Sequence, residues 1–216
     1  MGSKRVGLAR TQALIENLKR ELGMGGSTFN QANIQGAPNA TTAGTPGPGL
    51  QSGSISAPTC RVTNLNGEIV TTIQLDLQNL SGSNGASQVC IGNAEAAADG
   101  TSYAYLYQHD NAVNGILYKI EMSCIEAIAG GPANAAFVIS GSTLGLYEHG
   151  QSPSGDAWGA YTTGGNIGIH ETIVDNDVTS SQDAYMYLCN GAAGGGSTGK
   201  FTAGKLIMRF YGYKDF

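Results

Sequence analysis

The chain has 216 residues, enough for one full-sized domain and an appendage, and only 12% of them are charged. This is about half the usual charged fraction of ~25%. It is typical of Gly-rich β proteins with long loops, and also of chains whose surfaces other subunits cover. The net charge of −5 comprises +3 on residues 1–22 and −8 on the remainder. The basic segment lacks interleaved aromatic side chains, which disfavours nucleic-acid binding and favours docking on an acidic protein surface.

An amphipathic helix is predicted from Val6 to Leu22, and Gly23 is a natural stop. A helix of about four turns is marginal in water, so its apolar side needs a partner. That partner is the chain's own body, a symmetry mate or another protein; a frayed tail is the alternative. We expect residues 1–22 to be an anchor helix whose partner-binding side chains are Leu8, Leu14, Ile15, Leu18 and Leu22.

No targeting or membrane segment is expected. The basic start is interrupted by Arg10 and Glu16 rather than followed by an apolar run, and no stretch has the ~18 apolar residues of a membrane span. We therefore expect synthesis and assembly in a cytoplasm. The cysteines have no C-x-x-C spacing, so buried free thiols are expected at Cys60, Cys90, Cys124 and Cys189.

Residues 23–59 are predicted to form an extended arm. The stretch 23–60 carries no charged side chain and is rich in Gly, Ser, Thr, Asn and Pro. The run Pro46-Gly47-Pro48-Gly49 is expected to exclude regular structure. The arm would separate the anchor helix from a compact body and lie along a partner.

Residues 60–216 are predicted to be an all-β body. Asn66-Gly67 between two apolar runs indicates a hairpin, and in the strand 116–125 Tyr118 is expected to share the face of Ile120 while Lys119 and Glu121 face the other way. About ten short strands with frequent turns favour a sandwich, jelly roll or barrel, and we predict a jelly-roll-like β-sandwich. The predicted strands are 61–65, 68–77, 87–91, 102–109, 116–125, 136–140, 143–149, 159–163, 166–174, 184–189 and 205–213.

No motif indicates catalysis, a cofactor or a metal. Gly195–Gly199 fits G-x-S-x-G around Ser197, but a strand rather than a helix follows, so a flexible loop is the better interpretation. His109, His149 and His170 could form a site only by converging in three dimensions, and solvent-facing or interface positions are expected for them. We therefore expect no enzymatic activity, no cofactor and no metal.

Tyrosines at alternate positions are the strongest candidates for contact residues. Such spacing predicts a rigid amphipathic surface suited to protein interfaces or to stacking on sugars, and a cross-strand ladder in the core is the alternative. We call this set the tyrosine strip: Tyr103, Tyr105 and Tyr107 on one strand, with Tyr185 and Tyr187 on another.

The chain opens with MGSKRVGLARTQALIENLKREL (1–22), and its last strand reads GKLIMRFYGY (204–213). The opening resembles the start of small virion structural proteins of marine tailed phages, including those infecting cyanobacteria, and the ending is similar in character. The close resemblance covers about a tenth of the chain. It implies a place in the phage particle and supplies no catalytic residues.

These observations together lead us to expect a capsid decoration (cement) protein in the virion. The helix and arm would dock on the major capsid protein or a neighbouring virion subunit, and the body would form a homo-oligomer. A trimer is favoured because closed cyclic symmetry is common and icosahedral shells offer threefold positions. The alternative is a tail- or fibre-associated β module that binds host glycans.

Overall fold

The computed structural model describes residues 39–42, 45–51, 58–65, 67–82, 89–93, 100–131, 137–143, 145–153, 167, 170, 172–175, 183–190 and 199–214. The chain divides into two units, Met1–Asn39 and Ala40–Phe216, and the second holds almost all described residues. The predicted anchor helix lies outside the described residues. Its proposed contacts therefore stay predictions: Leu8, Leu14, Ile15, Leu18 and Leu22.

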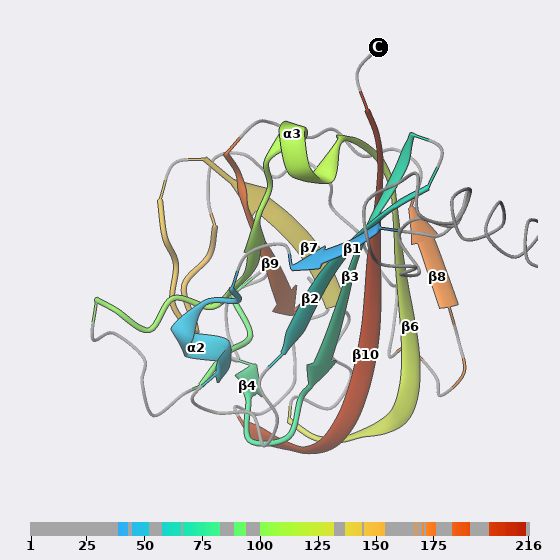
Figure 1. Cartoon of the computed structure of the whole chain (residues 1–216). Helices are drawn as coiled ribbons and strands as arrows, with labels where there is room; N and C mark the ends of the chain where they lie inside the picture. The colour runs from blue at the N-terminus through green and yellow to red at the C-terminus, as the bar shows by residue number, and fades with distance from the viewer. Residues whose placement is uncertain are drawn as a thin grey trace, which may run out of the picture. The chain divides into compact units, whose positions relative to one another are not determined.

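Seven of the described strands form the larger sheet, in which the long strands β10 and β6 lie side by side (Figure 1). The order is β1 (Asn39–Thr42), β2 (Thr59–Leu65), β3 (Glu68–Asp76), β10 (Gly199–Tyr213), β6 (Ile116–Gly130) and β8 (Thr172–Asp175), with β4 (Ser81–Gly82) paired to the start of β10.

A smaller antiparallel sheet packs against this one through a common core. Its order is β5 (Tyr105–Gln108), β9 (Tyr185–Asn190) and β7 (Phe137–Ser142). The ring of Tyr107 in β5 lies 4.9 Å from that of Phe210 in β10, and Phe137 in β7 lies 6.2 Å from Phe201. The prediction of an all-β body is thus confirmed, while the finer jelly-roll assignment stays a prediction.

Local sequence explains the hairpin of β2 and β3. The strands pair from Leu65 opposite Glu68 to Thr59 opposite Gln74, so they flank the predicted Asn66-Gly67 turn. Along β3, buried residues alternate with more exposed ones, as expected for a strand with one covered face. The hairpin prediction is therefore confirmed.

A β-bulge changes which face of β6 carries an aromatic ring. On β10, Tyr211 pairs with Lys119 but the next residue pairs with Leu117, so Tyr118 is the extra residue. Tyr118 and Lys119 both lie on the face away from the core, while Leu117 and Ile120 are buried. The prediction that Tyr118 shares the face of Ile120 was wrong, because strict alternation cannot anticipate an inserted residue.

Part of the predicted arm belongs to the β body. Gly47 N–H donates to the Tyr105 carbonyl (2.8 Å) and Gly49 N–H to the Tyr103 carbonyl (2.9 Å). Pro48–Gln51 forms the short helix α2, so the expectation of no regular structure in 46–49 was wrong for Pro48 and Gly49. The side chain of Leu50 is fully buried in the core. The prediction of an arm over all of 23–59, with the body starting at residue 60, is corrected for 39–42, 45–51 and 59. Asn39–Thr42 and Thr59 belong to strands of the larger sheet, and backbone hydrogen bonds to Tyr103 and Tyr105 with the buried Leu50 hold 45–51 on the body.

Candidate functional site

Two members of the tyrosine strip are core residues. Tyr107 and Tyr187 are 0% exposed. The Tyr187 hydroxyl accepts a hydrogen bond from the Tyr147 N–H (3.2 Å) and its ring meets that of Tyr147 edge-on. Because β9 is the central strand of the smaller sheet and Met186–Asn190 is buried throughout, both of its faces are covered. The prediction that Tyr107 and Tyr187 bind a partner was therefore wrong.

Tyr103 stands apart from the other tyrosines of the strip. It forms an isolated bridge with Glu148, outside the regular strands, and its hydroxyl donates to the Gly100 carbonyl at 2.6 Å. That local hydrogen bond ties Tyr103 to its own loop. Among the described residues, the ring of Tyr185 meets that of Tyr105, and Tyr103 has no such ring contact with either.

Tyr105 and Tyr185 do come together, on the side of β5 and β9 that is partly open. Their ring centroids are 4.9 Å apart and the planes are tilted by 60°. Burial raises the pKa of Tyr105, and the neighbouring Tyr185 adds to the shift. Among the described residues, neither hydroxyl has a hydrogen-bond partner. The two rings form one wall of a hollow of about 400 Å³, the Tyr105–Tyr185 hollow, whose other lining residues are Thr45, Gln108, Asp110, Val113 and Asn114.

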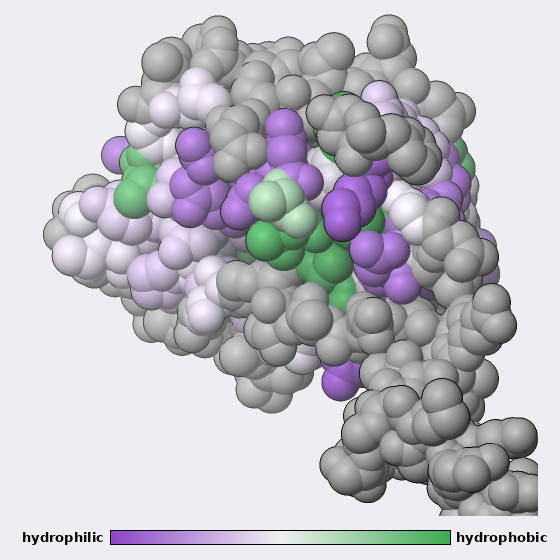
Figure 2. All heavy atoms as spheres, turned by 45° about the horizontal axis from the view of Figure 1, so that its top comes forward, coloured by the Kyte–Doolittle hydropathy of each residue, from purple (hydrophilic) through white to green (hydrophobic). Residues whose placement is uncertain are grey.

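The remaining walls of this hollow are held by hydrogen bonds. The Asp110 carboxylate caps helix α3 (Asn111–Asn114) by accepting from the Ala112 N–H at 2.8 Å. The Asn114 amide donates to the Thr71 hydroxyl at 2.8 Å and accepts from the Asp110 N–H. Figure 2, in which the top of Figure 1 comes forward, shows a hydrophobic patch among hydrophilic residues on that side of the body; of the residues that line the hollow, only Val113 is hydrophobic on the scale of this figure. Ring faces beside fixed acceptors can stack on and hydrogen-bond to a neutral, hydroxyl-rich ligand.

A second aromatic cluster lies on the outer face of the larger sheet, opposite the core. The Tyr118 ring centroid is 6.4 Å from that of Tyr211 and 6.2 Å from that of Tyr213. Tyr118 is 36% and Tyr213 43% exposed. We call this surface the tyrosine face and define it by Glu68, Tyr118, Lys119, Glu121, Arg209, Tyr211 and Tyr213.

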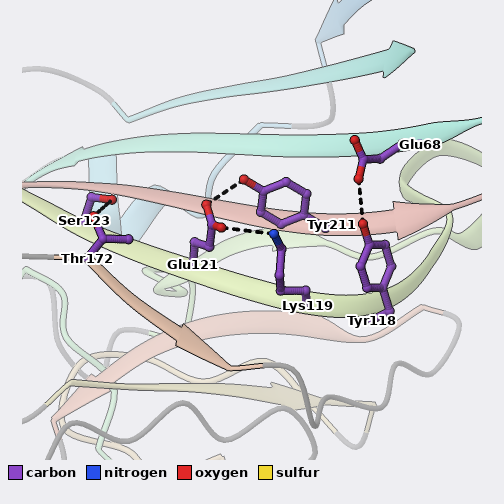
Figure 3. Close-up of polar contacts among 7 residues, drawn as sticks. All are labelled: Glu68, Tyr118, Lys119, Glu121, Ser123, Thr172 and Tyr211. Atoms are coloured by element: carbon purple, nitrogen blue, oxygen red, sulfur yellow. Dashed lines mark hydrogen bonds and ion pairs between the residues drawn. The ribbon is translucent and has the colours of Figure 1, made fainter. Parts of the chain in front are cut away.

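Charged groups hold the rings of the tyrosine face in place (Figure 3). The Lys119 ammonium lies 3.7 Å from the Tyr211 ring centroid and 3.0 Å from a Glu121 oxygen, and the Tyr211 hydroxyl donates to the other Glu121 oxygen at 2.6 Å. The Tyr118 hydroxyl donates to Glu68 at 2.6 Å, and this hydrogen bond is the main reason that the pKa of Tyr118 is raised to about 12. These contacts hold the charged and aromatic side chains of the face in one arrangement.

The electrostatic balance of the face follows from the strand register. Arg209 lies opposite Glu121 on one side and opposite Thr72 on the other. Burial alone would raise the pKa of the Glu121 carboxyl, but hydrogen bonds from Tyr211 and Lys119 outweigh it, and the pKa lies below its ordinary value. The tyrosine face therefore presents aromatic rings next to acidic and basic side chains that lie close enough to offset one another's charge.

Sequence reasoning missed the tyrosine face for an identifiable reason. Tyr118 was assigned to the core side of β6, so it was not grouped with the tyrosines of the last strand. The alternation Tyr211-Gly212-Tyr213 was a usable signal, since residues two apart on a strand share a face. Only the register of β10 against β6 places these rings beside Tyr118.

The histidines do not converge on a site. His109 is fully buried, with its ring nitrogens 3.4 Å from the Tyr107 hydroxyl and 3.1 Å from the Asn111 amide oxygen, so the prediction of a solvent or interface position was wrong for it. His170 is exposed, in a turn with φ of 64°. Among the described residues, no group of three His, Cys, Asp or Glu side chains is placed to hold a metal ion. Ser197 lies outside the described residues.

Comparisons of this chain with models of known protein families, with curated proteins and with solved structures found no match. In the part of the chain that the structure describes, neither α2 nor α3 is long enough to cross a membrane.

Proposed function

We propose that this chain is a non-enzymatic structural protein of the virion, of the capsid-decoration type, and that the tyrosine face is the surface through which its body contacts another subunit. The tyrosine face is the observation that carries this proposal. Tyrosine and arginine are enriched at the centres of protein interfaces, where they supply much of the binding energy. The resemblance of residues 1–22 to small virion proteins gives the proposal its biological setting.

The order of the side chains supports binding by this face. Each long side chain that is immobilised on association costs about 0.5–1.5 kcal/mol, and prior ordering reduces that cost. Tyr211, Lys119 and Glu121 already hold one another through a hydrogen bond, an ion pair and a ring contact. A surface built this way suits a specific protein partner.

The assembly we propose follows from these parts. The anchor helix and arm dock on the major capsid protein or on a neighbouring virion subunit, and a jelly-roll-like body self-associates, as a trimer in the favoured form. An exposed apolar side chain next to the face would gain from cover: Val174 (46% exposed) lies opposite Glu121 on the neighbouring strand β8.

Binding to particles tests the proposal directly. Particles that lack the protein would be incubated with the full chain and with a double variant, Tyr118→Ser with Tyr213→Ser. We expect the variant to remain folded by circular dichroism and to lose at least tenfold in particle binding or self-association, because it removes two exposed rings. Tyr185→Ser, which alters only the hollow, is the matched control. Unchanged binding by a folded double variant would refute the role of the face.

A second function is supported by the Tyr105–Tyr185 hollow. The partly exposed rings of Tyr105 and Tyr185 lie beside the Asp110 carboxylate and the Asn114 amide. Such a surface suits recognition of host glycans, the activity expected of a tail- or fibre-associated module. In a glycan-binding screen with the full chain, Tyr185→Ser should then abolish binding while the double variant of the tyrosine face binds normally. The opposite pattern in the two assays would favour the decoration role.

A further inference from the structure

Two of the four free cysteines face each other across a strand pair. Cys90 and Cys189 are partners in an antiparallel β-bridge, and both are fully buried. The flanking hydrogen bonds run from Ile91 N–H to the Leu188 carbonyl (2.9 Å) and from Asn190 N–H to the Val89 carbonyl (3.0 Å). Since these bonds lie on either side of the two cysteines, the cysteines themselves form a non-hydrogen-bonded pair.

That position has the geometry that a disulfide requires. In a non-hydrogen-bonded antiparallel pair the Cα atoms lie about 4.5 Å apart and the side chains project from the same face. Disulfides span Cα separations of roughly 4.4–6.8 Å. Burial raises the pKa of the Cys90 thiol, and a hydrogen bond with the Cys189 thiol adds to the shift, which agrees with two side chains in contact.

We infer that Cys90 and Cys189 are a latent disulfide, kept as thiols where the chain is made and closed when the folded protein meets a disulfide oxidant. During local opening, one cysteine thiolate attacks a small-molecule disulfide such as oxidised glutathione and releases one equivalent of thiol. The second cysteine thiolate then displaces the other thiol from the mixed disulfide. The protein loses two hydrogens and two electrons, and the oxidant becomes two thiols.

The other two cysteines serve as internal controls. Cys60 lies in β2 and Cys124 in β6, and two strands, β3 and β10, separate them in the larger sheet. Three strand spacings amount to about 14 Å, too far for a disulfide. The Cys124 thiol donates to the Glu126 carbonyl at 3.1 Å, and burial raises the pKa of Cys60 to about 12. Neither should react under conditions that close the Cys90–Cys189 pair.

Closure would join the segment around Cys90 to the central strand of the smaller sheet. The cysteines are about 100 residues apart, so the cross-link would remove a large amount of freedom from the unfolded chain. We expect the oxidised protein to melt roughly 5–15 °C above the reduced protein. This inference concerns the body alone and does not rest on the proposed function.

Thiol counting and peptide mapping test the inference on the full chain. The reduced protein would be held in oxidised glutathione with mild urea, which increases local opening, and its thiols counted after denaturation. We expect the count to fall from four to two, and a peptide containing Cys90 to be joined to one containing Cys189. Cys90→Ala should form no disulfide within the protein and should lose at most one thiol, as a mixed disulfide of Cys189 with glutathione, whereas the control Cys60→Ala should fall from three thiols to one.

Several results would overturn the inference. They are four thiols persisting after prolonged exposure, a cross-linked peptide that contains Cys60 or Cys124, or an unchanged melting temperature in a protein shown to be oxidised. Mapping of the unaltered chain needs no variant, and Cys189→Ala repeats the test if Cys90→Ala does not fold.

Discussion

Replacing Gly49 with alanine should destabilise the body strongly, although alanine is a better helix former than glycine. Gly49 lies in α2, where the change would otherwise favour the folded state by about 1 kcal/mol. A methyl group at this position, however, would lie 2.2 Å from the Ser102 carbonyl oxygen. An ordinary carbon–oxygen contact is about 3.3 Å, so the segment has to move by about 1 Å.

The cost of that movement can be worked out from the contacts it breaks. Gly49 N–H donates to the Tyr103 carbonyl and the Gly49 carbonyl accepts from Asn93 N–H, both at 2.9 Å. Each of these bonds contributes about 1 kcal/mol net. Lifting the fully buried Leu50 side chain out of the core costs up to about 2 kcal/mol more. We expect a loss of about 3 kcal/mol in the free energy of unfolding and a melting temperature lower by about 10 °C.

Urea and thermal unfolding of the full chain, followed by circular dichroism, would measure this loss. Gly145→Ala is the matched control, because the nearest atoms to the added methyl group are 3.9 Å away in the Tyr147 ring. That variant should stay within about 0.5 kcal/mol of the unaltered chain. If Gly49→Ala were as stable as Gly145→Ala, the packing of 45–51 on the body would be refuted.

Three further predictions concern the core, the pH dependence and the tyrosine face. Tyr187→Ser should cost about 3–5 kcal/mol in urea unfolding because its ring is fully buried, whereas Tyr185→Ser should cost less than half of that. Burial lowers the pKa of His109 below 6.5, so its contribution to stability is complete above pH 6.5 and is lost as the pH falls through the interval between 6.5 and the lowered value. Urea midpoints measured across this interval should decline, and His109→Gln should flatten the decline; an unchanged slope would contradict the assignment. Lys119→Met should lose about 0.5–1 kcal/mol more in the unaltered chain than in a chain whose Tyr211 is already alanine, because only the ion pair of Lys119 with Glu121 is left there.

The sequence could predict those parts of the fold that depend on short-range pattern. Alternation along 68–76 and the Asn66-Gly67 turn determined a strand pair and its register, because a one-residue slip would expose the buried face. Several such alternating patterns, taken together, were enough to predict the all-β fold class. The pairing of β10 between β3 and β6 joins residues far apart in the chain, and local patterns contain no information about it.

The tyrosine strip shows where pattern reasoning stops. Alternation correctly indicates that two side chains share a face, but it does not say whether another segment covers that face. Tyr185 stays partly open, whereas Tyr187 is covered by Tyr147 from a distant segment. A register shift between Tyr105 and Tyr107 separates those two residues as well. Whether a given tyrosine is a core or a surface residue was therefore decided by tertiary contacts.

The Pro-Gly-Pro-Gly run explains why a stretch that reads as an irregular arm can still pair with the body. Proline has no N–H, so in a paired segment it can occupy only positions whose N–H is not needed for a hydrogen bond. In 46–49 the prolines alternate with glycines, and the two glycine N–H groups are the ones that donate to the carbonyls of Tyr105 and Tyr103. The absence of side chains on Gly47 and Gly49 permits the close approach, since a methyl group on either would lie 2.2 Å from a backbone oxygen. The Pro-Gly alternation is thus compatible with these two hydrogen bonds even though α2 begins at Pro48, and the buried Leu50 adds an apolar contact with the core.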